Sequence, residues 1–533
     1  MKKKSLLVAS VFAGSLFLAA CGTKAESVPA KASNDKPAAT ESAKSLASIK
    51  DEGNKVVVNL VAKETQQELA KGVKMTVWTY GGTVPGKEIR VKQGQEVVVH
   101  LKNELQKNVT IHWHGYPVPT QMDGVPGLSQ NSIKPGQSFT YDFKATIPGT
   151  YWYHSHVDSV NQIDKGLYGA FIVEKKDEPK VSKDYTVMLD EWETGTAKND
   201  QSMSGMDHSQ MQNMSHDNMG NMSNGNMQGM SNDSMQNMSQ KQMGSMMNMD
   251  HMASYNLFTV NGKSGSLIEP LQVKTGDKVR LRFINAGYQL RLMDFGNIAY
   301  KVVATDGQDI QQPGEVKNKL LPVAPGERYD VEFTVPSTGF VISDRTQRPA
   351  AKDIKILIKN QDSNQVVQSD KVNSQLFDIT TYGKGQISIP KKFNDEYKMV
   401  FQDVMDQSSD MGMKYTINGK SFPNTEPLNV KKNDWVKVTF ENKGQANHPM
   451  HLHGHSFIVL SKNGVPLKGS PIIKDTLNVK PNETYEIAFK ADNPGDWMFH
   501  CHDLHHASTG MATVVHYDGY KTPAGVDKAG IKE

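Results

Sequence analysis

The chain has 533 residues, which exceeds what one hydrophobic core organises, so two or three domains are expected. Its formal net charge is +3 and 22% of its residues are charged, which excludes an electrostatic case for binding nucleic acid. Cys21 and Cys501 are the only cysteines, so no disulfide can form if Cys21 carries another group.

The N-terminus predicts an export signal followed by a tether. Lysines at positions 2–4 precede an apolar run over 6–20, which is short for a transmembrane span. The run ends in Leu-Ala-Ala-Cys, which is similar to a bacterial lipobox in which the thiol of Cys21 carries lipid. An ordinary signal peptide with an incidental cysteine, or an uncleaved anchor, is the alternative. We expect a signal peptide at 1–20 and a flexible polar tether at 21–53.

The lipobox also predicts where the protein resides. We expect an exported protein that is lipid-anchored on the outer face of a bacterial cell membrane, which is the periplasmic side in a Gram-negative cell. Its expected partners are therefore a membrane, through the N-terminal lipid, and small molecules outside the cytoplasm.

Three landmarks recur in the same order three times along the rest of the chain. The first is a strand, a tight turn at Gly or Asn, and an alternating strand, found at 89–99, 271–281 and 428–438. A Pro-Gly or Pro-Asn turn follows in each copy, and then a glycine turn with an aromatic residue. This long period indicates homologous domains, and the strand pattern predicts an all-β fold of three Greek-key β-sandwiches. The expected domains are 54–177, 183–362 and 374–520, followed by a C-terminal tail at 521–533.

The first domain carries two His-x-His motifs, at 112–114 and 154–156. Residues i and i+2 of a strand point to the same face, about 6.6–7 Å apart, so both imidazoles of a motif can reach neighbouring metal ions. A single such pair could arise by chance or lie on a surface. The second domain has Val-Ile-Ser at 341–343 in the matching place, which predicts a middle domain without ligands that acts as a spacer.

A methionine-rich insert interrupts the second domain at 196–254. Fifteen of the 27 methionines lie between Met203 and Met252, in Met-x-x-Met units that recur every eight residues among polar filler. An amphipathic helix is the alternative, but this period drifts by about 80° per repeat around a helix, so disorder is expected. Thioethers are soft ligands suited to Cu(I), so we expect the insert to bind additional copper weakly instead of serving as a neutral linker.

The third domain adds a histidine-rich motif at 448–454 and a His-Cys-His motif centred on Cys501. His448, His506 and Cys501, with Met511 as a thioether, form the set expected for blue electron-transfer copper. Structural zinc also accepts Cys and His, but zinc explains neither the eight further histidines nor the methionine. We therefore predict copper.

With these four motifs the chain resembles the three-domain multicopper oxidases, the family of laccases, bilirubin oxidases and bacterial cuprous oxidases, over 54–520. The resemblance implies cupredoxin-like domains, four copper ions and the reduction of O2 to two water molecules by four one-electron oxidations. The type 1 copper would take His448, Cys501, His506 and Met511, and the type 2 copper His112 and His451. One type 3 copper would take His114, His154 and His502, and the other His156, His453 and His500.

The resemblance also implies how the parts work together. The three-ion cluster would lie between the first and third domains, and Cys501 would pass electrons to it through the two histidines that adjoin it. A carboxylate beside the cluster relays protons in the family, and the matching residue is Asp123, whose alternative role is an Asp-Gly turn. Many relatives have a second acidic residue just after the position of His506. This chain has Ala507 there, which leaves a second relay open.

Two substrates remain in view. Cuprous oxidases carry Met-rich segments over the type 1 site, so we predict a cuprous oxidase in copper tolerance, with O2 as the second substrate. A laccase that oxidises phenols or aromatic amines shares every ligand and is the alternative, because 444–447 lacks the Met and Asp that hold substrate copper in those relatives. A copper sponge or a dead relative would not need an intact ligand set, and a two-domain nitrite reductase would not supply it. We expect a monomer.

Overall fold

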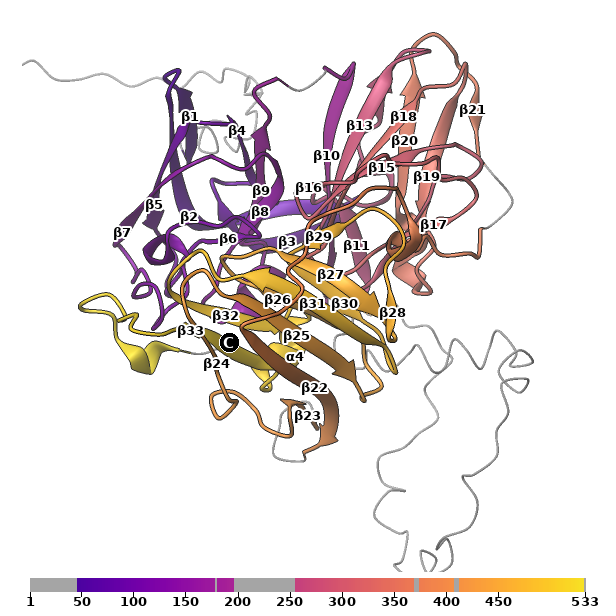
Figure 1. Ribbon diagram of the computed structural model, residues 1–533. Helices are drawn as coiled ribbons and strands as arrows, with labels where there is room; N and C mark the ends of the chain where they lie inside the picture. The colour runs from indigo at the N-terminus through magenta and orange to yellow at the C-terminus, as the bar shows by residue number, and fades with distance from the viewer. Residues whose placement is uncertain (1–45, 178–179, 196–254, 369–372, 407–411, 532–533) are drawn as a thin grey trace, which may run out of the picture. The chain divides into compact units, whose positions relative to one another are not determined.

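The computed structural model of the chain describes residues 46–177, 180–195, 255–368, 373–406 and 412–531 (Figure 1). The signal peptide, Cys21, most of the tether and the methionine-rich insert lie outside these ranges. Within them the chain is built almost entirely of β-strands, which confirms the predicted all-β class. No helix of these residues has the length and apolar character needed to cross a bilayer.

The first sandwich consists of one sheet in the order β1-β2-β5-β7, with β3 paired to β2, and another in the order β4-β9-β8-β6. Alternate residues of β2 and β5, among them Val56, Val58, Val97 and Val99, are buried in one core because side chains of a strand alternate between its faces. The strands are β1 (Ala47–Asp51), β2 (Lys55–Ala70), β3 (Val73–Tyr80), β4 (Gly86–Lys92), β5 (Glu96–Asn103), β6 (His112–His114), β7 (Ser138–Lys144), β8 (Gly149–His154) and β9 (Tyr168–Glu174).

Strand β1 lies inside the segment that the sequence predicts to be tether. It pairs antiparallel with β2, with Ala47 opposite Leu60 and Asp51 opposite Val56. Ile49 packs against the core of the first sandwich, and the pairing satisfies backbone groups of β2. The tether boundary at residue 53 is therefore wrong.

The second sandwich has sheets in the orders β11-β10-β13-β18-β15-β16 and β12-β20-β19-β14-β17, with β21 paired to β19. The first of these is formed by β10 (Lys183–Trp192), β11 (Leu257–Val260), β13 (Lys278–Asn285), β15 (Lys301–Thr305), β16 (Gln308–Asp309) and β18 (Arg328–Thr334). The second is formed by β12 (Leu271–Val273), β14 (Arg291–Asp294), β17 (Leu320–Val323), β19 (Gly339–Asp344), β20 (Lys355–Asn360) and β21 (Val366–Val367).

The second domain extends past its predicted end at residue 362. Strand β21 joins its sheet, and Phe377 is buried in its hydrophobic core. The backbone N–H of Phe377 also donates to Leu320 of β17. Residues after 362 thus pack on the second sandwich through a short strand pairing and a buried aromatic ring, and neither follows an alternating pattern in the sequence.

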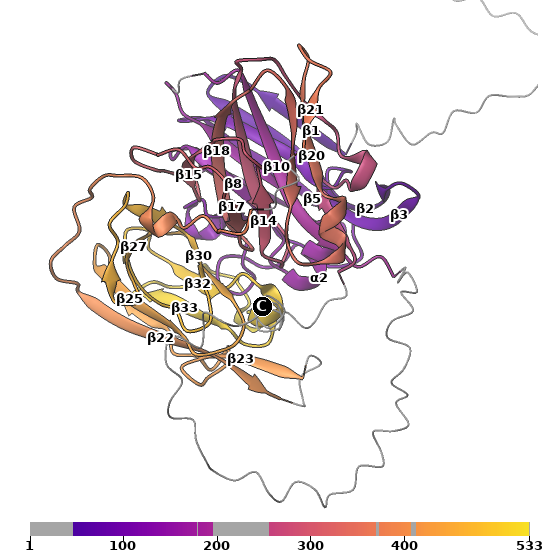
Figure 2. The same ribbon diagram turned by 90° about the vertical axis from the view of Figure 1, so that its right-hand side faces the viewer.

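The third sandwich has sheets in the orders β23-β22-β25-β31-β27-β28, with β29 paired to β27, and β24-β33-β32-β26-β30. The first is formed by β22 (Asp395–Met405), β23 (Met413–Ile417), β25 (Trp435–Asn442), β27 (Phe457–Lys462), β28 (Val465–Pro466), β29 (Ile472–Lys474) and β31 (Thr484–Lys490). The second is formed by β24 (Leu428–Val430), β26 (His448–Leu452), β30 (Thr476–Val479), β32 (Asp496–Cys501) and β33 (Ala512–Tyr517). In Figures 1 and 2 the hairpin of β22 and β23 lies at one edge of the first of these two sheets, as the strand order requires.

The repeated sequence pattern has one structural meaning in all three sandwiches. Its first strand belongs to one sheet and its second strand to the other, as in β4 and β5, β12 and β13, and β24 and β25. The tight turn of each repeat therefore carries the chain between sheets. The short helical elements are η1 (Thr120–Met122), α2 (Ser159–Asp164), η5 (Gly265–Leu267), η6 (Pro349–Asp353), η7 (Ile379–Thr381), α4 (Leu504–Ser508) and η8 (Lys528–Gly530).

Candidate metal centres

The histidine motifs lie on neighbouring strands of the first and third sandwiches. Strands β6 and β8 are antiparallel and place His112 opposite His154, while β26 and β32 place His451 opposite His500. Cross-strand partners lie about 5 Å apart, so each pairing brings two motifs together without help from loops. Eight histidines of these motifs are predicted to bind the three copper ions that the first and third domains share. Each of the eight is at most 1% exposed.

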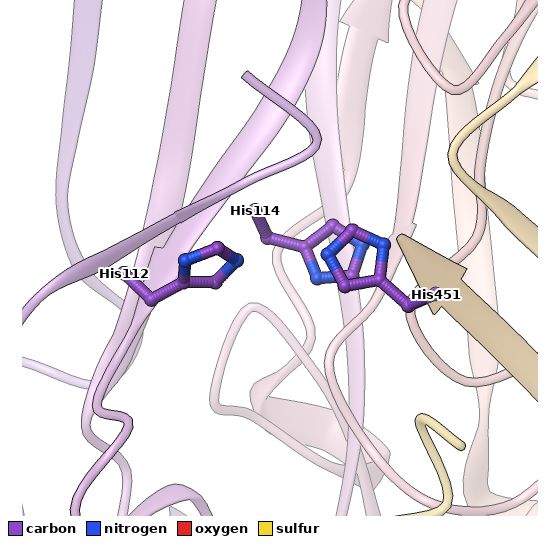
Figure 3. Close-up of side chains that lie close together, drawn as sticks. All are labelled: His112, His114 and His451. Atoms are coloured by element: carbon purple, nitrogen blue, oxygen red, sulfur yellow. The ribbon is translucent and has the colours of Figure 1, made fainter. Parts of the chain in front are cut away.

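All eight of these histidines meet in one place. Their ring nitrogens form three groups in which every ligand atom lies within 4.8 Å of the others. Figure 3 shows the first group, in which the rings of His114 and His451 stack at 3.7 Å between centroids and a nitrogen of His112 points toward them. The groups are His112, His114 and His451; His114, His154 and His502; and His156, His453 and His500. The last two match the predicted type 3 sets, and the first contains the predicted type 2 pair.

The inner nitrogens of these rings fit a metal. His112 Nδ1 donates to the carbonyl of Asp123 at 2.9 Å, and His154 Nδ1 donates to that of Ser155 at 2.9 Å. Among the described residues, Nε2 of both rings is buried without a hydrogen-bond partner. Such atoms are costly to bury unless they bind something, and a histidine whose outer N–H is fixed by a carbonyl is the usual form of a metal ligand.

Three of these rings also favour the neutral form that metal binding requires. Burial, followed by repulsion from neighbouring imidazoles, lowers the pKa of His154, His156 and His502 well below the usual histidine range. A neutral imidazole offers a lone pair, whereas a protonated one offers none. The donor set of eight buried rings fits the copper cluster that the sequence predicts.

Asp123 connects the two halves of this cluster. Its Oδ1 lies 3.1 Å from Nδ1 of His112 in the first domain, and its Oδ2 lies 3.0 Å from Nδ1 of His453 in the third. It is buried directly after η1. The carboxylate predicted to lie beside the cluster therefore does so, and its function as a proton relay stays a prediction.

The mononuclear group lies within the third domain. Cys501 is buried, and its Sγ lies 3.8 Å from Nδ1 of His448 and 3.6 Å from Nδ1 of His506. The short helix α4 turns the chain back, so that Met511 donates its N–H to the carbonyl of His506 at 3.0 Å. Met511 also packs in the same core cluster as Cys501. All four predicted type 1 ligands therefore lie in one buried region.

Two carboxylates beside this group were missed from the sequence. Asp403 Oδ1 lies 3.3 Å from Nε2 of His448, and Asp503 Oδ2 lies 3.5 Å from Nε2 of His506. Burial opposes ionisation of Asp503, but the charges of His506 and His505 outweigh it and lower its pKa to about 2. Asp403 lies on β22, far from the histidine motifs in the chain, and no local pattern indicates it. Asp503 follows the His-Cys-His motif and could have been noticed there.

The middle domain is more than a spacer, and that prediction is wrong. Its Gly326 packs so closely on the cluster that a Cβ there would lie 2.8 Å from Cγ of His502 and 3.1 Å from Cε1 of His114. Arg328, two residues on, forms an ion pair at 2.6 Å with Asp475 of the third domain. The signal available in the sequence was the Lys-Asp pair at 474–475 within an apolar strand pattern.

A surface cavity of about 830 Å³ reaches the cluster from the side of the first domain. Its lining includes His156, Lys134, Asp158 and, from the C-terminal tail, Asp527. His156 of the cluster therefore contributes to the wall of this cavity.

Comparisons with known proteins agree with this geometry. Three family models, each described as multicopper oxidase, match residues 61–178, 183–362 and 364–519. The chain is 30% identical to multicopper oxidase MmcO of Mycobacterium tuberculosis over 87% of this chain and 88% of that protein. It is 26% identical to a copper resistance protein A homolog of Pseudomonas syringae, over 85% and 91%. A crystal structure of a multi-copper oxidase from Pseudomonas thermotolerans has a TM-score of 0.63 and 26% identity, over 87% and 99%.

Proposed function

This chain belongs to the multicopper oxidase family, and from that premise we propose that it oxidises Cu(I) to Cu(II) outside the cell membrane. As a multicopper oxidase it is an oxidoreductase that holds copper and uses O2 as the electron acceptor. The choice of Cu(I) as the substrate rests on the contact between Asp403 and His448. Asp403 lies on β22, and the same strand carries the exposed side chain of Met405.

Asp403 and Met405 suit a soft cation. Side chains at i and i+2 of β22 point to the same face, and Met405 is 81% exposed. A carboxylate attracts a cation, and a thioether favours Cu(I) over harder ions. The backbone N–H of Ala446 donates to Asp403 at 3.0 Å, which holds the carboxylate beside His448. These residues supply from β22 the Asp and Met chemistry that is missing from 444–447.

The proposed ligand sets follow the three histidine groups and the mononuclear group. His448, Cys501, His506 and Met511 hold the type 1 copper; His112 and His451 the type 2 copper; and His114, His154, His502, His156, His453 and His500 the type 3 pair. The bound copper ions supply one-electron redox chemistry for the reduction of O2 to water. The protein holds the imidazole lone pairs inward, keeps bulk water out, and links the two sites through the covalent bonds between Cys501 and its two neighbours.

Asp123 is the proposed proton-holding group. Its carboxylate contacts the outer nitrogens of His112 and His453, so it can accept or release a proton beside the cluster without becoming a ligand. The cavity at His156 supplies the proposed approach for O2 and water.

The methionine-rich insert is proposed to bring Cu(I) to the side of the third domain where His505 and His506 lie. The insert leaves β10 and returns at β11, and Thr194 and Asn256 on its two sides are joined by a hydrogen bond of 3.0 Å. Tyr255, which directly follows the insert, places its hydroxyl 3.5 Å from Nε2 of His505, the neighbour of His506. The residues on the two sides of the insert are thus joined to each other, and Tyr255 lies beside the chain neighbour of a proposed type 1 ligand, which supports delivery of captured copper there.

The test compares Cu(I) with a phenol in oxygen-uptake assays on the copper-loaded protein. Deletion of 203–252 should raise the Michaelis constant for Cu(I) by about tenfold, which corresponds to about 1.4 kcal/mol of lost capture, and should leave or raise phenol turnover. A same-length variant with the insert methionines changed to Gln separates thioether chemistry from bulk. Unchanged Cu(I) oxidation in both variants would exclude the insert as a substrate funnel.

Oxidation of phenols or aromatic amines is the second candidate, because 444–447 lacks Asp and Met and every copper ligand would be shared. Met511 as a thioether ligand predicts a modest type 1 potential, which disfavours difficult aromatic substrates. A wild-type kcat/KM for phenols above that for Cu(I) would select this alternative.

We also propose that Cys21 carries the lipid that anchors the enzyme outside the cell membrane. Cys21→Ala should move activity from the membrane fraction to the soluble fraction without changing copper content. Activity that stays with the membrane in this variant would reject the anchor.

A further inference from the structure

One guanidinium lies where the three domains meet. Arg328, the first residue of β18 in the middle domain, is 0% exposed. Its Nε donates to the carbonyl of Thr150 in the first domain at 3.1 Å. Its Nη1 and Nη2 donate to the two carboxylate oxygens of Asp475 in the third domain at 2.7 and 2.6 Å. This forked pairing fixes both the position and the rotation of the carboxylate.

Asp475 and Thr476 in turn face two cluster histidines. The hydroxyl of Thr476 donates to Oδ1 of Asp475 at 2.8 Å, so its oxygen is left to accept. That oxygen lies 3.1 Å from Nε2 of His114 and 3.1 Å from Nδ1 of His451. Oδ1 of Asp475 is 3.4 Å from each of the same two nitrogens. The outer N–H groups of both rings therefore converge on these two side chains, and Nδ1 of His451 also lies 3.0 Å from the backbone carbonyl of Asp475.

The opposite nitrogens of these two rings point into the cluster. Within the part of the chain that the structure describes, Nδ1 of His114 and Nε2 of His451 are buried without a hydrogen-bond partner. His114 uses its Nε2 on the outside and His451 its Nδ1, so the acceptor pair selects a different tautomer in each ring. The two rings stack in this arrangement, with 11° between their planes.

The ion pair of Arg328 and Asp475 is packed tightly against the backbone of Gly115. A Cβ on Gly115, the residue after His114, would collide with Nη2 of Arg328 and with Oδ2 of Asp475. Gly115 has a φ of +78°, a backbone conformation that side chains disfavour. If Arg328 were lost, Asp475 would be a buried charge without its partner, and it would have to rotate or admit water. Either response moves the side-chain acceptors that His114 and His451 share.

We propose that Arg328 is a positioning residue through which the middle domain holds His114 and His451 in the orientation that binds copper. This inference rests on the proposed ligand sets, in which His451 serves the type 2 copper and His114 a type 3 copper. Loss of Arg328 releases type 2 copper from the shared cluster and leaves the type 1 copper in place.

The experiment uses the copper-loaded full chain with Arg328→Met and Arg328→Lys. Copper per chain, the type 2 electron paramagnetic resonance signal and the type 1 thiolate absorption band are followed as a chelator is added. Arg328→Met should hold type 2 copper about 10- to 100-fold more weakly, while the type 1 band persists. Arg328→Lys, which keeps the charge but not the fork, should recover part of the affinity.

Arg282→Met is the matched control. Arg282 is also buried, pairs with Asp330 at 2.8 Å and donates to the hydroxyl of Thr150 at 2.9 Å, and neither of these partners is a cluster histidine. It should lower the midpoint of thermal unfolding by a similar amount and retain type 2 copper.

Three results would overturn the inference. The first is that Arg328→Met retains type 2 copper as well as the wild-type protein does. The second is that Arg328→Met and Arg282→Met lose type 2 copper equally, which would reveal general destabilisation. In both cases a normal wild-type spectrum leaves the ligand sets intact. A wild-type protein with neither the band nor the type 2 signal would reject the ligand sets and the inference together.

Discussion

The mononuclear group and the shared cluster are built in opposite ways. His448, Cys501 and His506 come from β26, β32 and α4 of one sandwich, so the backbone ladder of a single domain places them. The eight-histidine cluster takes its rings from β6, β8, β26 and β32 and from the residues just after the last three of these strands, in the first and third domains, and Gly326 and Arg328 of the middle domain pack against it. The first site depends on local folding, whereas the second depends on how three domains dock.

The two sites also differ in their surroundings. Asp403, beside His448, is partly exposed and lies near the sheet edge at β23, where an electron donor can approach. The cluster histidines are at most 1% exposed and are surrounded by protein. The proposed sites of electron entry and oxygen reduction are separated in this way but linked through consecutive residues of β32 and the turn after it. Variants at each site should therefore have separable effects.

Cys501→Ser should have the largest effect, because it removes the only thiolate of the mononuclear group. We expect complete loss of the thiolate absorption band and of oxygen uptake, while the type 2 paramagnetic signal remains. The absorption spectrum, the electron paramagnetic resonance spectrum and the copper content of one sample test this expectation. Loss of cluster copper as well would mean that the two sites are not assembled independently.

Asp123→Asn should slow oxygen reduction by about a hundredfold, because the amide keeps the shape but cannot hold and release a proton in the same way. Reduction of the type 1 site by Cu(I) should keep its rate. Stopped-flow absorption separates bleaching of the thiolate band from its return with O2. Slow bleaching in this variant would contradict the separation of the two sites.

Gly326→Ala should destabilise the folded protein by about 1–3 kcal/mol and weaken copper retention by the cluster, because the added methyl meets His502 and His114. Gly276→Ala is the control, since it has a similar positive φ but nothing within 4 Å of the new Cβ, and should cost about 1 kcal/mol. Denaturant unfolding and copper analysis compare them. Equal effects would show that backbone strain, and not the cluster contact, is responsible.

Asp164→Asn should have the smallest effect, on the side of the mononuclear group where α2 packs against α4. Burial raises the pKa of Asp164 to about 6, from an ordinary value of 3.8. Folding therefore favours its protonated form, and its contribution to stability is present below about pH 4 and is lost as the pH rises through about 6. The variant should flatten that decline, as measured by unfolding across this range. A wild-type slope in the variant would assign the pH dependence to another group.

Much of the candidate site could be predicted because its signals are local. A His-x-His motif on a strand places two rings on one face whatever surrounds the strand, so the motifs at 112–114 and 154–156 already indicated paired metal ligands. Cys501 and Met511 are likewise brought together by one short helix. The all-β class followed from alternation and turns. The ends of the domains were less predictable, because β1 lies in a polar stretch and joins its sandwich by pairing with β2, and Phe377 joins its sandwich by a single buried ring.

The amino-acid sequence alone determined the strand pattern, the repeated strand-turn-strand motif and the candidate metal-binding side chains, because each motif spans only a few positions. Tertiary structure decided which distant groups support them. Arg328 meets Asp475 across 147 positions, and Asp403 meets His448 from another strand. A salt bridge or a glycine contact of that kind has no periodicity in the chain, since its geometry exists only after the domains have docked.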